Sequence, residues 1–240
     1  MLFRSRDARR LRAQTTRSAR GIGALRRYPL VVPLQPLEIE PVLVPMPPKV
    51  TAWLQAAQVR IDAFFVDPAH VSGRGFIPSD YQQVWCTLAG LARTATHRLR
   101  FCEWGSGFGV VVGFAVLLGM EAHGIEIDRA LCAVARQLLA EHGLGAEIAQ
   151  GSFVPEDYEP SARLADLDTR TVLGQPDGYD QLSRDLDEFE VVFAYPWPGE
   201  EDLYLDLFRR RADYGAVLIT HSRVEGMRAW RKVAARSTRR

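Results

Sequence analysis

Residues 101–109 read FCEWGSGFG, and the uncharged stretch VVVGFAVLLGM follows at once as residues 110–120. Residues 99–104 have the composition of a buried strand, and residues 110–120 have that of a buried helix. The glycine-rich loop between them therefore lies where a strand of an α/β sheet leads into a helix, which is the edge at which such sheets bind ligands. Glycines let a ligand approach the backbone there, and the start of the helix offers unpaired N–H groups.

The same alternation of strand and helix continues along the chain. We expect strands at residues 99–104, 122–127, 146–153, 190–197 and 215–222, and helices at residues 50–65, 110–120, 129–144 and 199–212. A further helix is expected to begin near Tyr81, with Ser79 or Asp80 as its N-cap. This alternation predicts an α/β fold, with a mostly parallel sheet and helices on both faces, in a single domain of residues 49–240.

Residues 1–48 differ from this domain. Residues 1–28 carry nine arginines and one acid, Asp7, without a periodic apolar face, which predicts a disordered, solvated tail. An arm that binds nucleic acid or a membrane surface, a targeting peptide and a misassigned start codon are the alternatives. Residues 29–48 are punctuated by prolines, which excludes a helix or a central strand and predicts an extended arm on the domain surface.

Composition limits the class of protein. The 240 residues are 47% hydrophobic and carry a net charge of +1, so one sizeable core is expected and a general nucleic-acid-binding protein is not. The longest uncharged run, residues 104–120, is too short to span a bilayer. The chain has three cysteines, Cys86, Cys102 and Cys132, and none of them forms a CxxC pair. This pattern predicts buried free thiols rather than a disulfide or metal site, in a reducing, cytoplasmic location. The sequence does not specify an oligomeric state.

The spacing of the loop separates two kinds of cofactor. Gly105, Gly107 and Gly109 follow Glu103 in the pattern E-x-G-x-G-x-G, whereas the dinucleotide fingerprint is G-x-G-x-x-G. No G-K-[ST] follows, which excludes a phosphate-binding P-loop. Glu126 ends the second strand, about twenty residues beyond the first glycine, where an acid can accept hydrogen bonds from both hydroxyls of a ribose. The loop and this acid together indicate a site for an adenosyl group.

On these motifs, residues 76–233 resemble the class I methyltransferases that use S-adenosylmethionine. The resemblance extends more loosely to the small protein-lysine methyltransferases of mitochondrial carriers and ATP synthase subunit c, and to their bacterial relatives. FIPSD at residues 76–80, EWGSGFG at residues 103–109 and GIEID at residues 124–128 carry it. It implies a Rossmann-like methyltransferase fold with S-adenosylmethionine as cofactor. The cofactor site that it implies consists of Glu103, Gly105, Ser106, Gly107, Gly109, Glu126, Ile127, Ser152, Phe153 and Tyr195.

The chain departs from the pattern of that family in several places. Many members have an acid where Ser152 stands, to receive the adenine amino group, and a hydroxyl accepts such a bond more weakly. Phe153 lies either against the adenine face or in the core. Most members close with an antiparallel hairpin, but here at most one strand, near residues 227–233, follows the fifth. The hairpin is therefore expected to be trimmed, or the sheet edge covered by the N-terminal arm. The long polar segment 155–188 is expected to form a lid or a substrate-binding insertion.

The acceptor site is defined by fewer residues. The fourth strand ends without the acid or amide that family members carry there to methylate amino groups of bases or glutamine, which disfavours a nucleobase acceptor. Tyr195 and Trp197 are either walls of a substrate slot, which would also attract a cationic lysine, or packing residues. Glu200 is a further expected substrate contact. Glu200, Glu201 and His221 are the candidates for a base, although acids in a first turn commonly serve the helix dipole. No catalytic residue is assigned.

Three functions from different classes follow. The first is a methyltransferase that uses S-adenosylmethionine to methylate a protein, lysine side chains included, or a small molecule. The second is a catalytically inactive protein of the same fold that acts as a binding module. The missing acid at the end of the fourth strand, the serine at position 152 and the trimmed hairpin are consistent with it. The third is a nicotinamide-dependent oxidoreductase, which the glycine spacing disfavours. Cofactor binding separates the first from the third, and turnover separates the first from the second.

Overall fold

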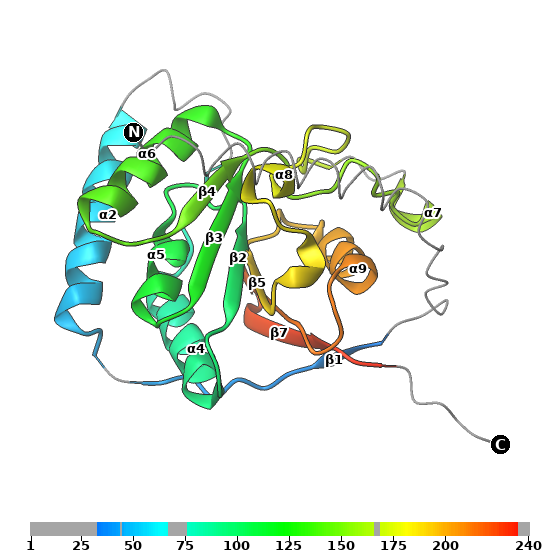
Figure 1. Ribbon diagram of the computed structural model, residues 1–240, viewed down its shortest axis with the longest axis horizontal. Coiled ribbons are helices and arrows are strands. Elements are labelled where there is room, and N and C mark those ends of the chain that lie inside the picture. Colours follow the sequence, from blue (N-terminus) through cyan, green and yellow to red (C-terminus); the bar gives the residue numbers. More distant parts are fainter. Residues whose placement is uncertain (1–32, 44, 67–75, 166–168, 235–240) are drawn as a thin grey trace, which may run out of the picture. The chain divides into compact units, whose positions relative to one another are not determined.

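The computed structural model describes residues 33–43, 45–66, 76–165 and 169–234. Its centre is a seven-stranded sheet in the order β1-β7-β6-β5-β2-β3-β4 (Figure 1). The strands are β1 (Leu34–Pro36), β2 (Arg100–Trp104), β3 (Glu121–Glu126), β4 (Glu147–Gln150), β5 (Val191–Ala194), β6 (Val217–Ser222) and β7 (Gly226–Lys232). The predicted tail at residues 1–28 lies outside the described residues.

The five expected strands are present and pair in parallel. β2 pairs with β3 and with β5, β3 pairs with β4, and β5 pairs with β6. The chain builds outward from β2 to β4 and then returns to the other side of β2 for β5 and β6. The strand order therefore reverses between β2 and β5, and the carboxyl ends of these two strands flank the crevice in which such sheets bind ligands.

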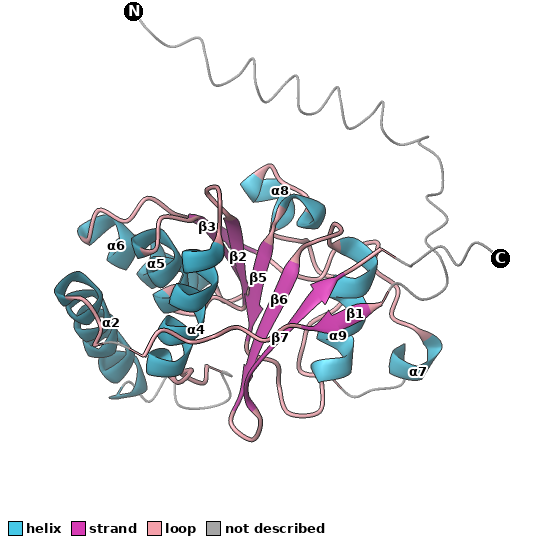
Figure 2. Cartoon of the chain, turned by 90° about the horizontal axis from the view of Figure 1, so that it is seen from below, coloured by secondary structure: helices cyan, strands magenta, loops and turns pink. Residues whose placement is uncertain are grey.

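Helices cover both faces of the sheet, which confirms the predicted fold class (Figure 2). The helices are α2 (Pro48–Val66), α4 (Tyr81–Thr94), α5 (Val110–Leu117), α6 (Arg129–Glu141), α7 (Ala162–Ala165), α8 (Tyr179–Leu182) and α9 (Glu201–Arg211), with a 3-10 turn at Leu186–Glu188. One core joins α2, α4, α5 and α6 to side chains such as Phe101 and Val191. A second core, on the other face, joins α8 and α9 to Cys102 and Val192. Consecutive strand residues thus alternate between two buried faces, as a covered parallel sheet requires.

The buried helix α5 is held against α2 by a close contact. The indole Nε1 of Trp53 donates to the Val110 carbonyl oxygen at 3.0 Å, and Trp53 is only 1% exposed. Gly113 faces this ring, and a Cβ atom at that position would lie 2.3 Å from two carbons of the indole. A residue without a side chain is therefore needed where the two helices meet.

We expect Gly113→Ala to destabilise the fold, although alanine ordinarily stabilises a helix by about 0.5–1 kcal/mol relative to glycine. Overpacking against a fully buried indole costs about 1–3 kcal/mol, so the clash outweighs the helix propensity. Urea unfolding of the variant measures the net change. Gly113→Ala in a Trp53→Leu background is the control, because the smaller side chain should recover the lost stability. If the two substitutions change the free energy of unfolding additively, the contact between these two residues does not contribute to stability.

The sheet edge is completed by the N-terminal arm. β6 turns directly into β7, which runs antiparallel to it, and β1 pairs antiparallel with the far side of β7. The predicted single extra strand is therefore confirmed, and the proline-rich arm supplies a short edge strand beyond it. Pro36 is tolerated there because an edge strand needs fewer backbone donors.

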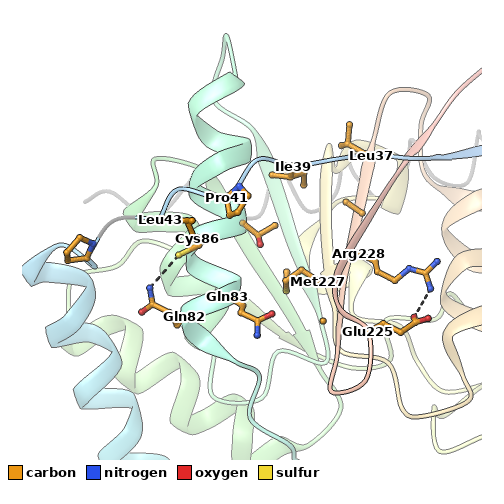
Figure 3. Close-up of a pocket in the computed structure, with 14 residues that line it drawn as sticks. Leu37, Ile39, Pro41, Leu43, Gln82, Gln83, Cys86, Glu225, Met227 and Arg228 are labelled. Atoms are coloured by element: carbon orange, nitrogen blue, oxygen red, sulfur yellow. Dashed lines mark hydrogen bonds and ion pairs between the residues drawn. The ribbon is translucent and has the colours of Figure 1, made fainter.

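Beyond β1 the arm crosses the surface of α4 (Figure 3). Leu37 N–H donates to the Ala229 carbonyl oxygen at 2.9 Å, and Val42 N–H donates to the Cys86 carbonyl oxygen at 3.0 Å. Leu37, Ile39, Pro41 and Leu43 line a cavity of about 700 Å³ between the arm, α4 and β7. None of the residues that line this cavity lines the pocket at the glycine loop.

Several local expectations can be compared with the structure. Asp80 is the N-cap of α4, since its carboxylate accepts from the N–H groups of Gln82 and Gln83 at 3.1 and 3.0 Å. The three cysteines are free and buried. The described residues of segment 155–188 contain two short helices and the 3-10 turn. Within the described ranges, no helix is long and apolar enough to cross a membrane, and no cluster of three potential metal ligands is found.

Candidate functional site

The glycine loop lies at the carboxyl end of β2 and is tied to the next strand. Gly105 N–H and Ser106 N–H both donate to the Ile125 carbonyl oxygen, at 2.9 and 3.0 Å. Gly105 has a φ of +70°, and a Cβ built on it would meet no atom within 4 Å. Gly107 has a φ of +50°, and its Cβ would lie 2.6 Å from the ring of Phe76. Gly105 therefore leaves open space for a ligand, whereas Gly107 makes room for an aromatic ring of the protein.

A pocket of about 380 Å³ opens in front of this loop. Its volume lies in the range of small-molecule sites, which is about 300–1,000 Å³. It brings together seven of the residues expected from the sequence: Gly105, Glu126, Ile127, Ser152, Phe153, Tyr195 and Trp197. These residues follow four neighbouring strands, so the pocket occupies the carboxyl edge where the strand order reverses.

Glu126 presents a carboxylate to this pocket. The side chain is 7% exposed; its Oε2 accepts from Gly107 N–H and its Oε1 accepts from Asp128 N–H, both at 2.8 Å. Burial raises the pKa of this carboxyl group, and the hydrogen bonds from Asp128 and Gly107 oppose that rise. A carboxylate offers about four acceptor positions, so one bond to each oxygen leaves acceptor capacity for two hydroxyl groups.

Glu103 lies behind the loop and does not line the pocket. It is buried, and its Oε2 accepts from Val112 N–H at 3.1 Å, in the first turn of α5. Burial raises the pKa of this carboxyl group well above its usual value, the Val112 hydrogen bond opposes the rise, and the charge of Glu126 adds to it. The structure thus shows Glu103 attached to the start of the helix.

We expect Glu103→Gln to stabilise the protein at pH 7. A raised pKa in the folded state means that the folded protein retains a proton which the unfolded chain has released, so stability falls as pH rises from the unfolded pKa through the folded pKa. The side-chain amide of the variant does not ionise, so this loss of stability with rising pH does not occur. Its oxygen can still accept from Val112 N–H. The expected gain is about 1 kcal/mol or more, since each pKa unit between the folded and unfolded states corresponds to about 1.4 kcal/mol.

Urea unfolding at pH 5 and pH 7 measures the effect, with Glu147→Gln as the control because Glu147 is an exposed strand acid. A loss of stability in Glu103→Gln at pH 7 would show that the ionised carboxylate is required.

Ser152 and Phe153 are held by contacts within the protein. The Ser152 hydroxyl donates to the Val172 carbonyl oxygen at 3.1 Å and accepts from Val154 N–H at 3.0 Å. The Phe153 ring stacks on Trp104, with centroids 5.1 Å apart and an interplanar angle of 11°. Ser152 therefore joins the end of β4 to the long segment 155–188, a contact that the sequence does not reveal.

That segment supplies a wall of the pocket, which we call the strap and define as residues 169–172. Arg170, Thr171 and Val172 line the pocket. The strap is fixed by Glu200, which is 5% exposed: its carboxylate accepts from Arg170 N–H, from Thr171 N–H at 3.2 Å and from the Thr171 hydroxyl at 2.5 Å. Thr171 is also 3.1 Å from the Tyr204 hydroxyl. Glu200 itself lines neither this pocket nor its neighbour.

A second pocket, of about 630 Å³, adjoins the first. The two share Ile77, Tyr195 and Trp197 as lining residues. The turn between β6 and β7 forms another side of the second pocket. The sequence therefore identified two of the three residues in the common wall, and Ile77 belongs to the FIPSD stretch that contributed to the resemblance.

His221 lies beside this wall without lining either pocket. Its ring centroid is 4.9 Å from that of Tyr195, and its buried Nδ1 has no hydrogen-bond partner among the described residues. Burial lowers the pKa of the imidazole, and the negative charge of Asp80 opposes part of this decrease. Burial therefore favours the neutral form of the ring.

The structure places the other predicted residues outside the pocket lining. Ser106, Gly107 and Gly109 form the loop and its packing, with the missing Cβ of Gly109 directed at Ala135. Residues that the sequence did not identify as site residues are Phe76, Ile77, Trp104, Ile125, Asp128, Leu131, Gly151, Arg170, Thr171, Val172 and Tyr204. The length of segment 155–188 was the one signal that pointed to the strap.

Comparison with known proteins gives remote similarities. No family model matches the chain, and no curated protein matches it. Among solved structures, an RNA methyltransferase from Salinibacter ruber in complex with S-adenosyl-L-homocysteine is 19% identical with a TM-score of 0.46, over 68% of this chain and 98% of that one. An O-methyltransferase from Bacillus cereus, also in complex with that ligand, is 15% identical with a TM-score of 0.45, over 77% of this chain and 70% of that one. Similarity at this level does not identify a reaction for this chain.

Proposed function

We propose that the protein is a methyltransferase that uses S-adenosylmethionine. The observation that carries the proposal is the placement of a left-handed glycine, Gly105, and a buried carboxylate, Glu126, in one pocket at the point where the strand order reverses. This pair suits an adenosyl group because the glycine permits close approach and the carboxylate accepts from the ribose hydroxyls. The spacing of the glycines is not that of the dinucleotide fingerprint.

The residues of the pocket have separate roles in this proposal. Gly105 admits the ligand to the backbone, Glu126 orients the ribose, and Ile127 contributes apolar surface near the base. Ser152 contributes little to base recognition, because its oxygen already accepts from Val154 N–H and its proton is donated to the Val172 carbonyl oxygen. The sulfonium of the cofactor supplies the activated methyl group, so the protein's main task is to hold donor and acceptor in line and to exclude water.

The second pocket is the proposed site of the methyl acceptor. Tyr195 and Trp197 form a common wall with the cofactor pocket, so an acceptor bound there lies next to the cofactor. A small molecule and a protein side chain are both compatible with the family resemblance. We propose Glu200 as a residue that positions the strap, in place of the direct substrate contact expected from the sequence.

Transfer of a labelled methyl group tests the proposal. The protein is incubated with S-adenosylmethionine labelled in the methyl group and with a cell extract separated into small molecules and macromolecules. We expect label in a product of the wild-type reaction and none with Glu126→Ala. Cofactor binding without transfer to either fraction would favour the binding module, and absence of both binding and transfer would contradict the proposal. The cytoplasmic location expected from the sequence stays a prediction.

A further inference from the structure

The second pocket has a composition that selects among acceptors. Its apolar walls are formed by Ile77, Tyr195, Pro196, Trp197 and Pro198, with Val224 at the turn. A pocket of about 630 Å³ with such walls and few polar groups is typical of small-molecule sites. The charged groups in its lining are two acids, Glu201 and Glu225, and two arginines, Arg223 and Arg228.

Three of these four charged side chains have partners within the protein. Arg228 forms an ion pair with Glu225 at 2.6 Å, and its guanidinium lies over the Trp230 ring. The Glu201 Oε2 accepts from Gly199 N–H at 3.0 Å, at the start of α9. Arg223 is exposed and has no ion pair or hydrogen bond to any described residue. Arg223 is therefore the one arginine of this lining without an ion pair. Glu201 has no ion pair either, but it lies in the first turn of α9, where the helix dipole and the Gly199 N–H offset its negative charge.

The same contacts disfavour a cationic acceptor such as a lysine side chain. The Arg170 guanidinium, which lines the first pocket, lies 4.9 Å from the centroid of the Trp197 ring, so one face of this ring already has a cation over it. A cation entering the pocket would also meet Arg223, while Glu225 is paired with Arg228 and the charge of Glu201 is offset by the start of α9.

We propose that the methyl acceptor is a small, largely apolar molecule that carries an anionic group, and that Arg223 binds this group. The proposal rests on the proposed function, since it assigns the acceptor of the same transfer. An arginine offers five N–H donors in a planar fork that matches a carboxylate or a phosphate. The apolar part of the acceptor packs between Tyr195 and Trp197, beside the cofactor pocket.

Three probes of one shape and different charge test this proposal. They are 2-naphthoate, the neutral 2-naphthamide and the cationic 2-naphthylmethylammonium, each titrated calorimetrically into the full chain saturated with S-adenosylhomocysteine. We expect the anion to bind about tenfold more tightly than the amide, which is about 1.4 kcal/mol, and the cation to bind most weakly. Arg223→Gln should remove the preference for the anion, and Arg223→Lys should retain most of it. Arg98→Gln, at an exposed arginine before β2, should leave it unchanged.

Other outcomes would overturn the proposal, and they can be separated from a failure of the proposed function. Tightest binding of the ammonium, equal binding of all three probes, or a preference that survives Arg223→Gln would each exclude the anion site. No probe binding to protein that holds S-adenosylhomocysteine would exclude it while leaving the function intact. Displacement of S-adenosylhomocysteine by the naphthoate would place the probe in the cofactor pocket. Failure of S-adenosylhomocysteine itself to bind would contradict the proposed function.

Discussion

Glu126→Ala should raise the dissociation constant for S-adenosylhomocysteine by about 100-fold or more. Hydrogen bonds to a charged group contribute about 1.5–3 kcal/mol each, and two ribose hydroxyls bonded to one carboxylate therefore account for a factor of this size. The variant also removes the acceptor of Gly107 N–H, which loosens the loop. Calorimetric titration measures the constant, and thermal unfolding verifies that the variant is folded.

Two further variants make this result specific. Glu126→Gln should also bind weakly. Both carboxylate oxygens of Glu126 accept a backbone N–H, and the amide nitrogen that replaces one of these oxygens is a donor and cannot accept such a bond. Glu147→Ala is the control, since this exposed acid begins the adjoining strand β4, at the opposite end from the pocket. Affinity unchanged in Glu126→Ala would mean that this carboxylate does not contact the ligand.

Glu200→Ala should weaken binding of the same ligand by about 10- to 100-fold, although Glu200 does not line the pocket. Its carboxylate accepts hydrogen bonds from Arg170 and Thr171, and without them the strap is no longer held in place. A ligand must then order the strap as it binds, at a cost of about 1–2 kcal/mol for each backbone residue fixed. Calorimetry measures the affinity, and hydrogen exchange of the strap amides reports its order.

Matched variants separate positioning from general damage. Glu200→Gln retains an oxygen acceptor and should recover part of the affinity. Asp202→Ala is the control, because Asp202 lies in the first turn of α9, two residues after Glu200, which is the N-cap. It pairs with Arg163 through an exposed salt bridge at 3.2 Å, which contributes little. Faster exchange in the strap of Glu200→Ala with unchanged affinity would show that the ligand does not use this wall.

The sequence predicted the parallel strands and the loop because those features have local signatures. The apolar composition of the strands, with residues such as Phe101 and Cys102, and the spacing from Gly105 to Glu126 are both visible in the chain itself. The edge strand β1 has no such signature, because its three residues include a proline and it forms only by pairing with β7. Its partner lies almost two hundred residues away by the numbering.

The role of the strap also depends on contacts between distant residues. Glu200 has the position of an ordinary acid in a first helical turn, and its burial beneath Arg170 and Thr171 becomes evident only in the fold. Ser152 is similar, since its hydroxyl bonds Val172 across the pocket wall. Residue types at fixed spacing therefore predicted the cofactor loop, while the insertion that completes the pocket required tertiary structure.

The most direct measurement is a calorimetric titration of the purified chain with S-adenosylmethionine, S-adenosylhomocysteine and NAD. We expect both adenosyl compounds to bind with micromolar dissociation constants at one site per chain, and NAD to bind far more weakly. Binding of NAD with equal or greater affinity would contradict the assignment in favour of an oxidoreductase. Absence of any adenosyl binding to folded protein would show that the glycine loop and Glu126 do not form a cofactor site.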